Sequence, residues 1–244
     1  MHSAIIYNGP SLIDGKPIVV IANGKKKSRP NEKTGDMVQT YIIRSDIDPR
    51  DASKTGEDFS ICGDCIHRGT PTESGKLAAG RSCYVNISQG VLQTYKAMLR
   101  GNYPMATTEQ TAEIGNGRMV RLGTYGDPAA VPQSVWDSLL SKSAGHTGYT
   151  HNGASTDVCM VSADSLSQAA RAWADGLRTF RVIKIADWKE HGKAALATNE
   201  ILCPASEEAG RRVQCNDCKL CSGSLLHAKS IAIVSHGAGK NNFQ

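Results

Sequence analysis

Seven of the eight cysteines fall into two groups whose spacing is typical of metal binding. The first cysteine group is Cys62, Cys65 and Cys83, and the second cysteine group is Cys203, Cys215, Cys218 and Cys221. The chain starts without a basic segment followed by a long apolar stretch, so we expect no secretory signal and a reducing compartment. Clustered cysteines in that setting indicate metal ligation or catalysis rather than a disulfide framework. The eighth, Cys159, lies in an apolar run and is expected to be a small buried side chain.

The second cysteine group contains the continuous run Cys-x2-Cys-x2-Cys, from Cys215 to Cys221. Four thiolates suit either a tetrahedral zinc ion or an iron–sulfur cluster. Zinc sites usually use two separated Cys-x2-Cys pairs, whereas a continuous run is typical of ferredoxin-like clusters, in which successive thiolates bind different irons. The spacing therefore favours a [4Fe–4S] cluster, with zinc as the alternative.

The first cysteine group has only three thiolates, which leaves one coordination position open. His67 stands two residues after Cys65 and could complete a closed zinc site. Alternatively, the three cysteines could hold a [4Fe–4S] cluster with one iron free for S-adenosylmethionine (SAM), the arrangement that starts radical chemistry by reductive cleavage of the sulfonium. The usual spacing in radical-SAM enzymes is Cys-x3-Cys-x2-Cys, and this chain departs from it. Both interpretations stay open on the residues alone.

Strands and helices alternate along most of the chain. Runs rich in Val, Ile, Thr and Tyr predict strands at 4–7, 17–22, 37–44, 119–125, 146–151, 158–162, 179–185, 200–202 and 231–234. Apolar residues at helical spacing predict helices over 91–99, from near Pro132 to Leu140, and from a cap at Asp164 or Ser165 to about Leu177. The polar stretch 45–60 is expected to be a loop that leads to the first cysteines.

This alternation predicts an α/β fold, either a partial barrel of the radical-SAM type or an open, largely parallel sheet. A full eight-stranded barrel usually takes about 250 residues, and the chain has only 244 in all, with its first sixty already assigned to extended structure. We divide it into a β-rich segment at 1–60, an α/β core with the first cysteine group at 61–202, and a cysteine-rich, metal-binding extension at 203–244.

Polar residues stand at the carboxyl ends of the expected strands, where α/β folds place their sites. They are Asp127, His151, Asp164, Cys203 and His236. Each has an ordinary alternative role, such as a turn residue, a hydrogen-bonding histidine or a helix cap. Their coincidence on one predicted edge favours a common site, in which His151 and Asp164 would line the substrate cavity as catalytic candidates.

An ordered series of short motifs resembles a family of phage-encoded proteins, the mycobacteriophage "gene product eighty-eight" type. The motifs are Cys62-Gly-Asp-Cys65, Ser82-Cys83-Tyr84, Arg121 with Gly126-Asp127, Tyr149-Thr150-His151, Ser162-Ala163-Asp164, Cys203-Pro204-Ala205, Cys215-Asn-Asp-Cys218-Lys-Leu-Cys221 and His236-Gly237. The resemblance implies a phage origin and the host cytoplasm as the location, and it brings no activity with it.

A second resemblance is one of layout. Gly126-Asp127-Pro128 after a strand is similar to the Gly-Glu-Pro segment with which radical-SAM barrels contact SAM, which implies that Gly126 and Asp127 bind this cofactor. The second cysteine group is similar to the auxiliary-cluster extensions of those enzymes.

The composition excludes some classes and leaves others open. No apolar run approaches the roughly 18–20 residues that cross a bilayer, so no membrane association is expected. The net charge of +5 is mild, and its one basic run offers a contact for nucleic acid or a host protein. That run contains Lys25, Lys26, Lys27 and Arg29.

Two functions from different classes remain. The first is a radical-SAM-like iron–sulfur enzyme that acts on a nucleotide, a nucleic acid or a host macromolecule. The second is a non-catalytic zinc or iron–sulfur protein that binds nucleic acid or a host factor, although aromatic residues for base stacking are few. A zinc deaminase ranks last because its His-x-Glu signature is absent.

Overall fold

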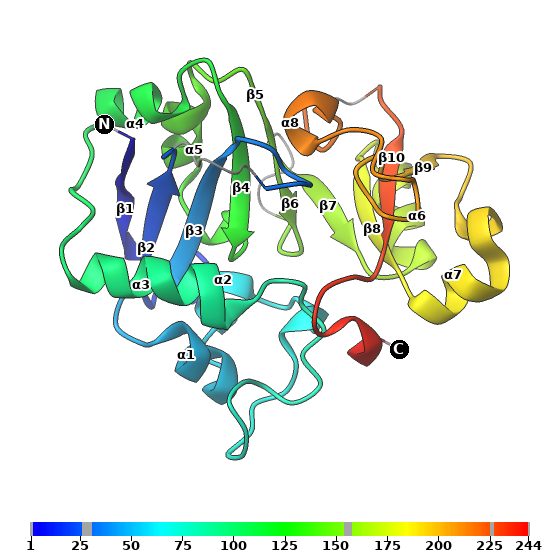
Figure 1. Ribbon diagram of the computed structural model, residues 1–244, viewed down its shortest axis with the longest axis horizontal. Coiled ribbons are helices and arrows are strands. Elements are labelled where there is room, and N and C mark those ends of the chain that lie inside the picture. The colour runs from blue at the N-terminus through cyan, green and yellow to red at the C-terminus, as the bar shows by residue number, and fades with distance from the viewer. Residues whose placement is uncertain (1, 26–30, 154–157, 225–226, 244) are drawn as a thin grey trace.

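The computed structural model describes residues 2–25, 31–153, 158–224 and 227–243. Over these ranges the chain forms two five-stranded sheets that lie side by side (Figure 1). The strands are β1 (Ser3–Pro10), β2 (Pro17–Asn23), β3 (Val38–Arg44), β4 (Met119–Tyr125), β5 (Gly145–Thr147), β6 (Tyr149–Thr150), β7 (Met160–Ala163), β8 (Thr179–Ile183), β9 (Glu200–Leu202) and β10 (Ser230–Val234). The helices are α1 (Pro49–Thr55), α2 (Phe59–Cys62), α3 (Leu92–Leu99), α4 (Thr108–Gly115), α5 (Gln133–Leu140), α6 (Leu166–Ala174), α7 (Ile185–His191) and α8 (Cys215–Cys218).

The predicted α/β class is confirmed, with a mixed first sheet and a parallel second sheet. The first sheet has the order β1-β2-β3-β4-β5 and the second has the order β6-β7-β8-β10-β9. β1, β2 and β3 pair antiparallel, β3, β4 and β5 pair parallel, and the described pairings of the second sheet are all parallel. The carboxyl ends of these parallel strands are therefore available to build one site.

Gly148 joins the two sheets. β5 ends just before it and β6 begins just after it, so the stretch predicted as a single strand borders both sheets. The Gly148 N–H donates to the carbonyl of Cys221 at 2.9 Å, which ties the second cysteine group to this joint. A Cβ at Gly148 would lie 2.8 Å from the Sγ of Cys159, which is buried as expected.

Each sheet packs against a core of its own. In the first, Trp136 of α5 is fully buried and donates its Nε1–H to the carbonyl of Pro128 at 3.0 Å. In the second, the smaller core includes Cys203 and Cys221 together with Ile231 of β10. Two thiols of the second cysteine group are therefore part of the packing that positions them.

The stretch 45–60 is not a loop, and that prediction was wrong. It contains α1 and the start of α2. Asp48 caps α1 by accepting a hydrogen bond from the Arg50 N–H, Pro49 occupies the first turn, and Gly56 ends the helix with a φ of 83°. The polar composition masked a short helix whose start and stop signals are both present.

Further elements differ from the prediction. α4 was not expected, although Thr107 and Gln110 form a capping box at its start. The strand predicted to reach Ile185 ends at Ile183, and Ile185 opens α7. The expected α6 begins after Ser165, whose side chain accepts a hydrogen bond from the Gln168 N–H.

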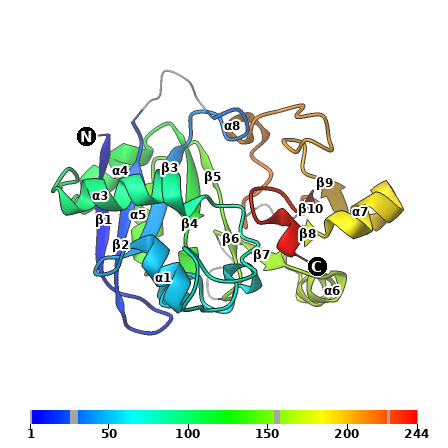
Figure 2. The same ribbon diagram turned by 60° about the horizontal axis from the view of Figure 1, so that its bottom comes forward.

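The segment 203–244 is not an extension outside the sheet. It supplies β10, which lies between β8 and β9. After β10 the chain turns toward the segment 81–84, where Asn242 donates to the carbonyl of Arg81 at 2.9 Å (Figures 1 and 2). Within the described ranges, no helix has the length and apolar character needed to cross a bilayer.

Candidate functional site

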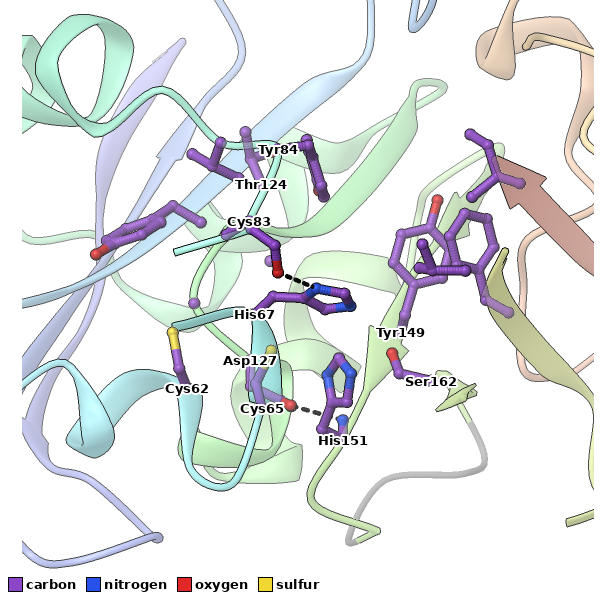
Figure 3. Close-up of a pocket in the computed structure, with 18 of the residues that line it drawn as sticks. Cys62, Cys65, His67, Cys83, Tyr84, Thr124, Asp127, Tyr149, His151 and Ser162 are labelled. Carbon is purple, nitrogen blue, oxygen red and sulfur yellow. Dashed lines mark hydrogen bonds between the residues drawn. The ribbon is translucent and has the colours of Figure 1, made fainter. Parts of the chain in front are cut away.

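A cavity follows the carboxyl ends of the parallel strands and is lined from both sheets (Figure 3). Its lining includes Tyr125 and Asp127 at the end of β4, His151 after β6, Cys203 after β9 and His236 after β10. Six of the seven grouped cysteines face this one cavity. They are Cys62, Cys65 and Cys83 from the first group and Cys203, Cys215 and Cys221 from the second.

The turn that carries Cys62 and Cys65 is held by Arg68. Its guanidinium donates to Asp58 Oδ1 at 2.7 and 2.9 Å, to the Gly63 carbonyl at 2.9 Å and to the Gly56 carbonyl at 2.7 Å. Cys62 ends α2, and Cys65 precedes the next short helical turn. Arg68 therefore fixes the backbone that carries the two thiols through hydrogen bonds to the carbonyls of Gly56 and Gly63.

Cys83 is brought to the same place by His67. The backbone N–H groups of Ser82 and Cys83 both donate to the His67 carbonyl, at 3.2 and 3.0 Å. Burial raises the pKa of both Cys62 and Cys83, and the nearby charges of Asp58 and Cys65 raise them further. Without a metal these thiols stay protonated, whereas a bound metal stabilises the thiolate form.

Asp127 supports this turn with both carboxylate oxygens. Oδ1 accepts from the Ala129 N–H at 2.9 Å, and Oδ2 accepts from the His151 N–H and from Asn152 Nδ2, both at 2.8 Å. Gly126, next to it, has a φ of 84°, and a Cβ there would lie 2.7 Å from the Cβ of Ile42. The Gly126–Asp127 pair therefore shapes the wall of the cavity through packing and backbone hydrogen bonds.

The second cysteine group is organised by Arg178, which is buried at the start of β8. Its guanidinium donates to four carbonyl oxygens at 2.6–2.8 Å, those of Leu220, Ser222, Ala228 and Lys229. The Cys215 N–H donates to the Lys33 carbonyl at 2.8 Å, which brings a residue from the loop before β3 against α8. Burial raises the pKa values of Cys203, Cys215 and Cys221. The charge of Lys33 partly offsets this for Cys203, and those of Arg121 and Lys33 partly offset it for Cys215, whereas the neighbouring thiols of the group raise all three pKa values. Cys218 is not among the residues that line the cavity.

Asp164 does not cap α6 but bridges two histidines. Its Oδ1 lies 2.8 Å from His67 Nε2, and its Oδ2 lies 3.3 Å from His151 Nε2. His67 Nδ1 lies 2.7 Å from Ser82 Oγ, so both of its ring nitrogens have partners other than a cysteine. Figure 3 shows the rings of His67 and His151 close together beside Cys65.

The electrostatics of this histidine pair follow from Asp164. Burial opposes the charged form of His151, but hydrogen bonds to Asp164 and Cys65 outweigh it and hold the pKa of His151 well above its ordinary value. Burial likewise opposes an ionised Asp164, and hydrogen bonds from His151 and His67 outweigh that and lower its pKa. In the described part of the chain, the ligand atoms of these three side chains form a group within 4.8 Å of one another that could bind a single metal ion.

Another part of the cavity is basic and aromatic. Arg121, on β4, donates from Nη2 to the hydroxyl of Tyr84 at 2.6 Å, and Lys33 Nζ lies 3.3 Å from His236 Nε2. Tyr84 and His236 stack with their ring centroids 5.3 Å apart. Sequence reasoning gave Lys33 no role, and for Arg121 the available signal was an arginine inside an otherwise apolar strand.

The other sequence-predicted residues are placed as follows. His236 joins the cavity from the end of β10, whereas Cys159 lies behind it beside Gly148. Lys25 is exposed at the end of its strand. Lys26, Lys27 and Arg29, the rest of the basic run, lie outside the described residues.

Comparisons with known proteins add no assignment to this site: no protein-family model, curated protein or solved structure matches the chain.

Proposed function

We propose that this protein is an iron–sulfur enzyme of the radical-SAM type, phage-encoded, whose two cysteine groups each hold a [4Fe–4S] cluster. The observation that carries the proposal is that cysteines from both groups, more than a hundred residues apart in the chain, line the same cavity. Two structural zinc sites can stabilise a fold without sharing a cavity, whereas two redox centres that act on one substrate must both face it.

Thiolates are the ligands of iron–sulfur clusters as well as of zinc. Among the described residues, the group whose ligand atoms lie within 4.8 Å of one another contains His67, His151 and Asp164 and no cysteine. In a cubane cluster each thiolate binds a different iron, so its thiols need not lie that close together. The Nε2 atom of His67 lies 2.8 Å from Asp164 Oδ1, which argues against a zinc site in which this histidine completes the first cysteine group.

The parallel strands support the assignment of the fold as a partial barrel of the radical-SAM type, which is part of this proposal. β3, β4 and β5 run parallel in the first sheet, and β6 continues the series into the second. A partial barrel places its reaction site where this chain places its cavity, at the carboxyl ends of the strands.

The chain's own residues have distinct tasks in this scheme. Cys62, Cys65 and Cys83 bind three irons of the first cluster and leave the fourth for SAM. Bound there, a reduced cluster would supply the one electron that cleaves SAM to methionine and a 5′-deoxyadenosyl radical, and this radical would become 5′-deoxyadenosine by taking a hydrogen atom from the substrate. Asp127 holds the turn, and His151, hydrogen-bonded to Asp164 and Cys65, would place a proton donor beside the Cys65 ligand. The substrate is a nucleotide, a nucleic acid or a host macromolecule.

The experiment is anaerobic purification and reconstitution, with iron, sulfide and zinc analysis and a SAM-cleavage assay under dithionite. Two cubane clusters predict about eight irons and eight sulfides per chain. The Cys159→Ala variant is the matched control, because that cysteine lies outside both groups. A preparation with two zinc ions and no iron, or full clusters without SAM cleavage, would overturn the proposal.

A second candidate function rests on the His67–Asp164–His151 group, whose two imidazoles and one carboxylate match the ligand set of mononuclear iron oxygenases. His67 has its other ring nitrogen hydrogen-bonded to Ser82, as metal-binding histidines usually do. This candidate predicts one iron without sulfide, lost in His67→Gln and kept in Cys65→Ala. The cluster proposal predicts the reverse, with loss in Cys65→Ala.

A further inference from the structure

The part of the cavity next to Tyr84 and His236 has an excess of positive charge, from Arg121 and Lys33. Arg121 makes no ion pair with any described carboxylate, and its Nε is buried without a hydrogen-bond partner among the described residues. Lys33 likewise contacts His236 rather than a carboxylate. A guanidinium has five N–H donors, so the one hydrogen bond to Tyr84 leaves most of its capacity unused.

The carboxylates that line the cavity are engaged elsewhere. Asp58 is paired with Arg68, and Asp127 holds the backbone of His151 and the side chain of Asn152. His236 adds no further positive charge at neutral pH, because burial and the nearby Lys33 lower its pKa to about 4, and its Nδ1 contacts the Val234 carbonyl. Within the described lining, neither cation in this part has a carboxylate partner, and the acidic groups of the second cysteine group that act on them are Cys215 for both and Cys203 and Cys221 for Lys33.

Flat aromatic surfaces lie next to these cations. Tyr84 stacks on His236, and Arg121 lies over the Tyr84 ring with its Cζ 5.6 Å from the ring centroid. Tyr149, which also lines the cavity (Figure 3), stacks on Phe180 with ring centroids 4.1 Å apart. Aromatic faces of this kind bind planar rings, and an arginine fork binds phosphate oxygens in a bidentate manner.

We propose that this part of the cavity binds a nucleoside phosphate, with its phosphate on Arg121 and Lys33 and its base against the aromatic side chains. The inference rests on the proposed function in one respect, which is that the bound ligand is the substrate. It then narrows the substrate class to nucleotides. The competing explanation is that both cations only neutralise the thiolates of the second cysteine group, since Cys203, Cys215 and Cys221 lie near Lys33.

Calorimetric titration of the reconstituted protein tests the inference directly. The probes are the four common ribonucleoside 5′-monophosphates, their nucleosides without phosphate, and inorganic phosphate. We expect at least one monophosphate to bind at least about tenfold more tightly than its nucleoside and than inorganic phosphate, since charge-assisted hydrogen bonds contribute at this scale.

Variants at Arg121 and Lys33 separate the contribution of positive charge to phosphate binding from that of the two-pronged guanidinium group. Arg121→Gln and Lys33→Gln should each weaken monophosphate binding by about tenfold and leave nucleoside binding within about twofold. Arg121→Lys, which keeps the positive charge, should recover part of the loss. That recovery would also show that the chain tolerates a substitution at position 121 and still folds. Lys76→Gln removes a charge from an exposed position outside the cavity and serves as the matched control.

Three outcomes would overturn the inference: no monophosphate binds at millimolar concentration, nucleoside and monophosphate bind equally, or Arg121→Gln binds like the unaltered protein. Failure of the proposed function is a separate result, because it is read from iron content and SAM cleavage. A chain that binds monophosphates but contains no iron keeps this inference and loses the radical-SAM proposal. Clusters with SAM cleavage but no monophosphate binding keep the radical-SAM proposal and overturn this inference.

Discussion

Asp127 and Asn152 are hydrogen-bonded to each other, with Nδ2 of Asn152 2.8 Å from Oδ2 of Asp127. The same Asn152 amide donates to the Cys62 carbonyl at 3.2 Å and accepts from the Asp64 N–H at 3.3 Å. A residue that follows β4 and a residue that follows β6 thus hold the turn between Cys62 and Cys65. The carboxyl ends of two parallel strands position the first cysteine group without contributing a ligand to it.

Replacement of Asn152 by Ala should therefore damage the first cysteine group. Three hydrogen bonds are lost, one of them to a carboxylate, and we expect the free energy of unfolding in urea to fall by about 1–3 kcal/mol. Iron bound by the first group should fall more than iron bound by the second. The exposed Asn102→Ala is the control, with a change within about 0.5 kcal/mol. Unchanged stability and iron content in Asn152→Ala would contradict the positioning role.

Replacement of Arg178 by Met should affect the second cysteine group instead. Four backbone carbonyls around Cys221 lose their donor, and we expect destabilisation by about 3 kcal/mol in urea unfolding. Arg171 on the exposed face of α6 provides the comparison through Arg171→Met. Equal iron loss from both groups in Arg178→Met would show that the groups fold as one unit.

Alanine substitutions at Gly126 and Gly176 separate the cost of backbone strain from the cost of side-chain crowding. Both glycines have positive φ, 84° and 74°, so Ala at either position should cost about 1–2 kcal/mol. A Cβ at Gly176 would have no described atom within 4 Å, whereas a Cβ at Gly126 would lie 2.7 Å from Ile42. Gly126→Ala should therefore have the lower melting temperature of the two, measured by calorimetry. Identical melting temperatures would mean that Ile42 moves aside freely.

The two cysteine groups should differ in what their loss does to SAM. Cys65→Ala removes a ligand of the cluster with the open iron and should abolish formation of 5′-deoxyadenosine in the dithionite assay. Cys218→Ala should remove about four irons from the second group. SAM cleavage to 5′-deoxyadenosine should continue in this variant without conversion of the substrate to product. Cys159→Ala should match the unaltered protein. Cleavage that survives in Cys65→Ala and disappears in Cys218→Ala would assign SAM to the second group.

Local patterns in the sequence determined much of the framework. Runs rich in Val, Ile, Thr and Tyr predicted the long strands β2, β3 and β4. In β2 the signal is a continuous apolar run, because Ile18 to Ala22 are all buried. Placing Asp127, His151 and Cys203 directly after strands required only the boundaries of those strands. The cysteine spacing identified both groups without any knowledge of the fold.

The tertiary structure alone decided which of these features meet. No local pattern relates Lys33 to Cys215, or Arg121 to Tyr84, because those contacts join segments far apart in the chain. Asp164 illustrates the same limit: the sequence predicts a helix cap at Asp164 or Ser165, and only the fold shows that Ser165 is the cap while the Asp164 carboxylate contacts His67 and His151. Periodicity and capping act over a few residues, whereas a cavity forms where packing brings strand ends together. The sequence predicted that Cys203 shares an edge with Asp127 and His151, facing the first cysteine group, but only the folded chain shows that Cys215 and Cys221 also line this cavity.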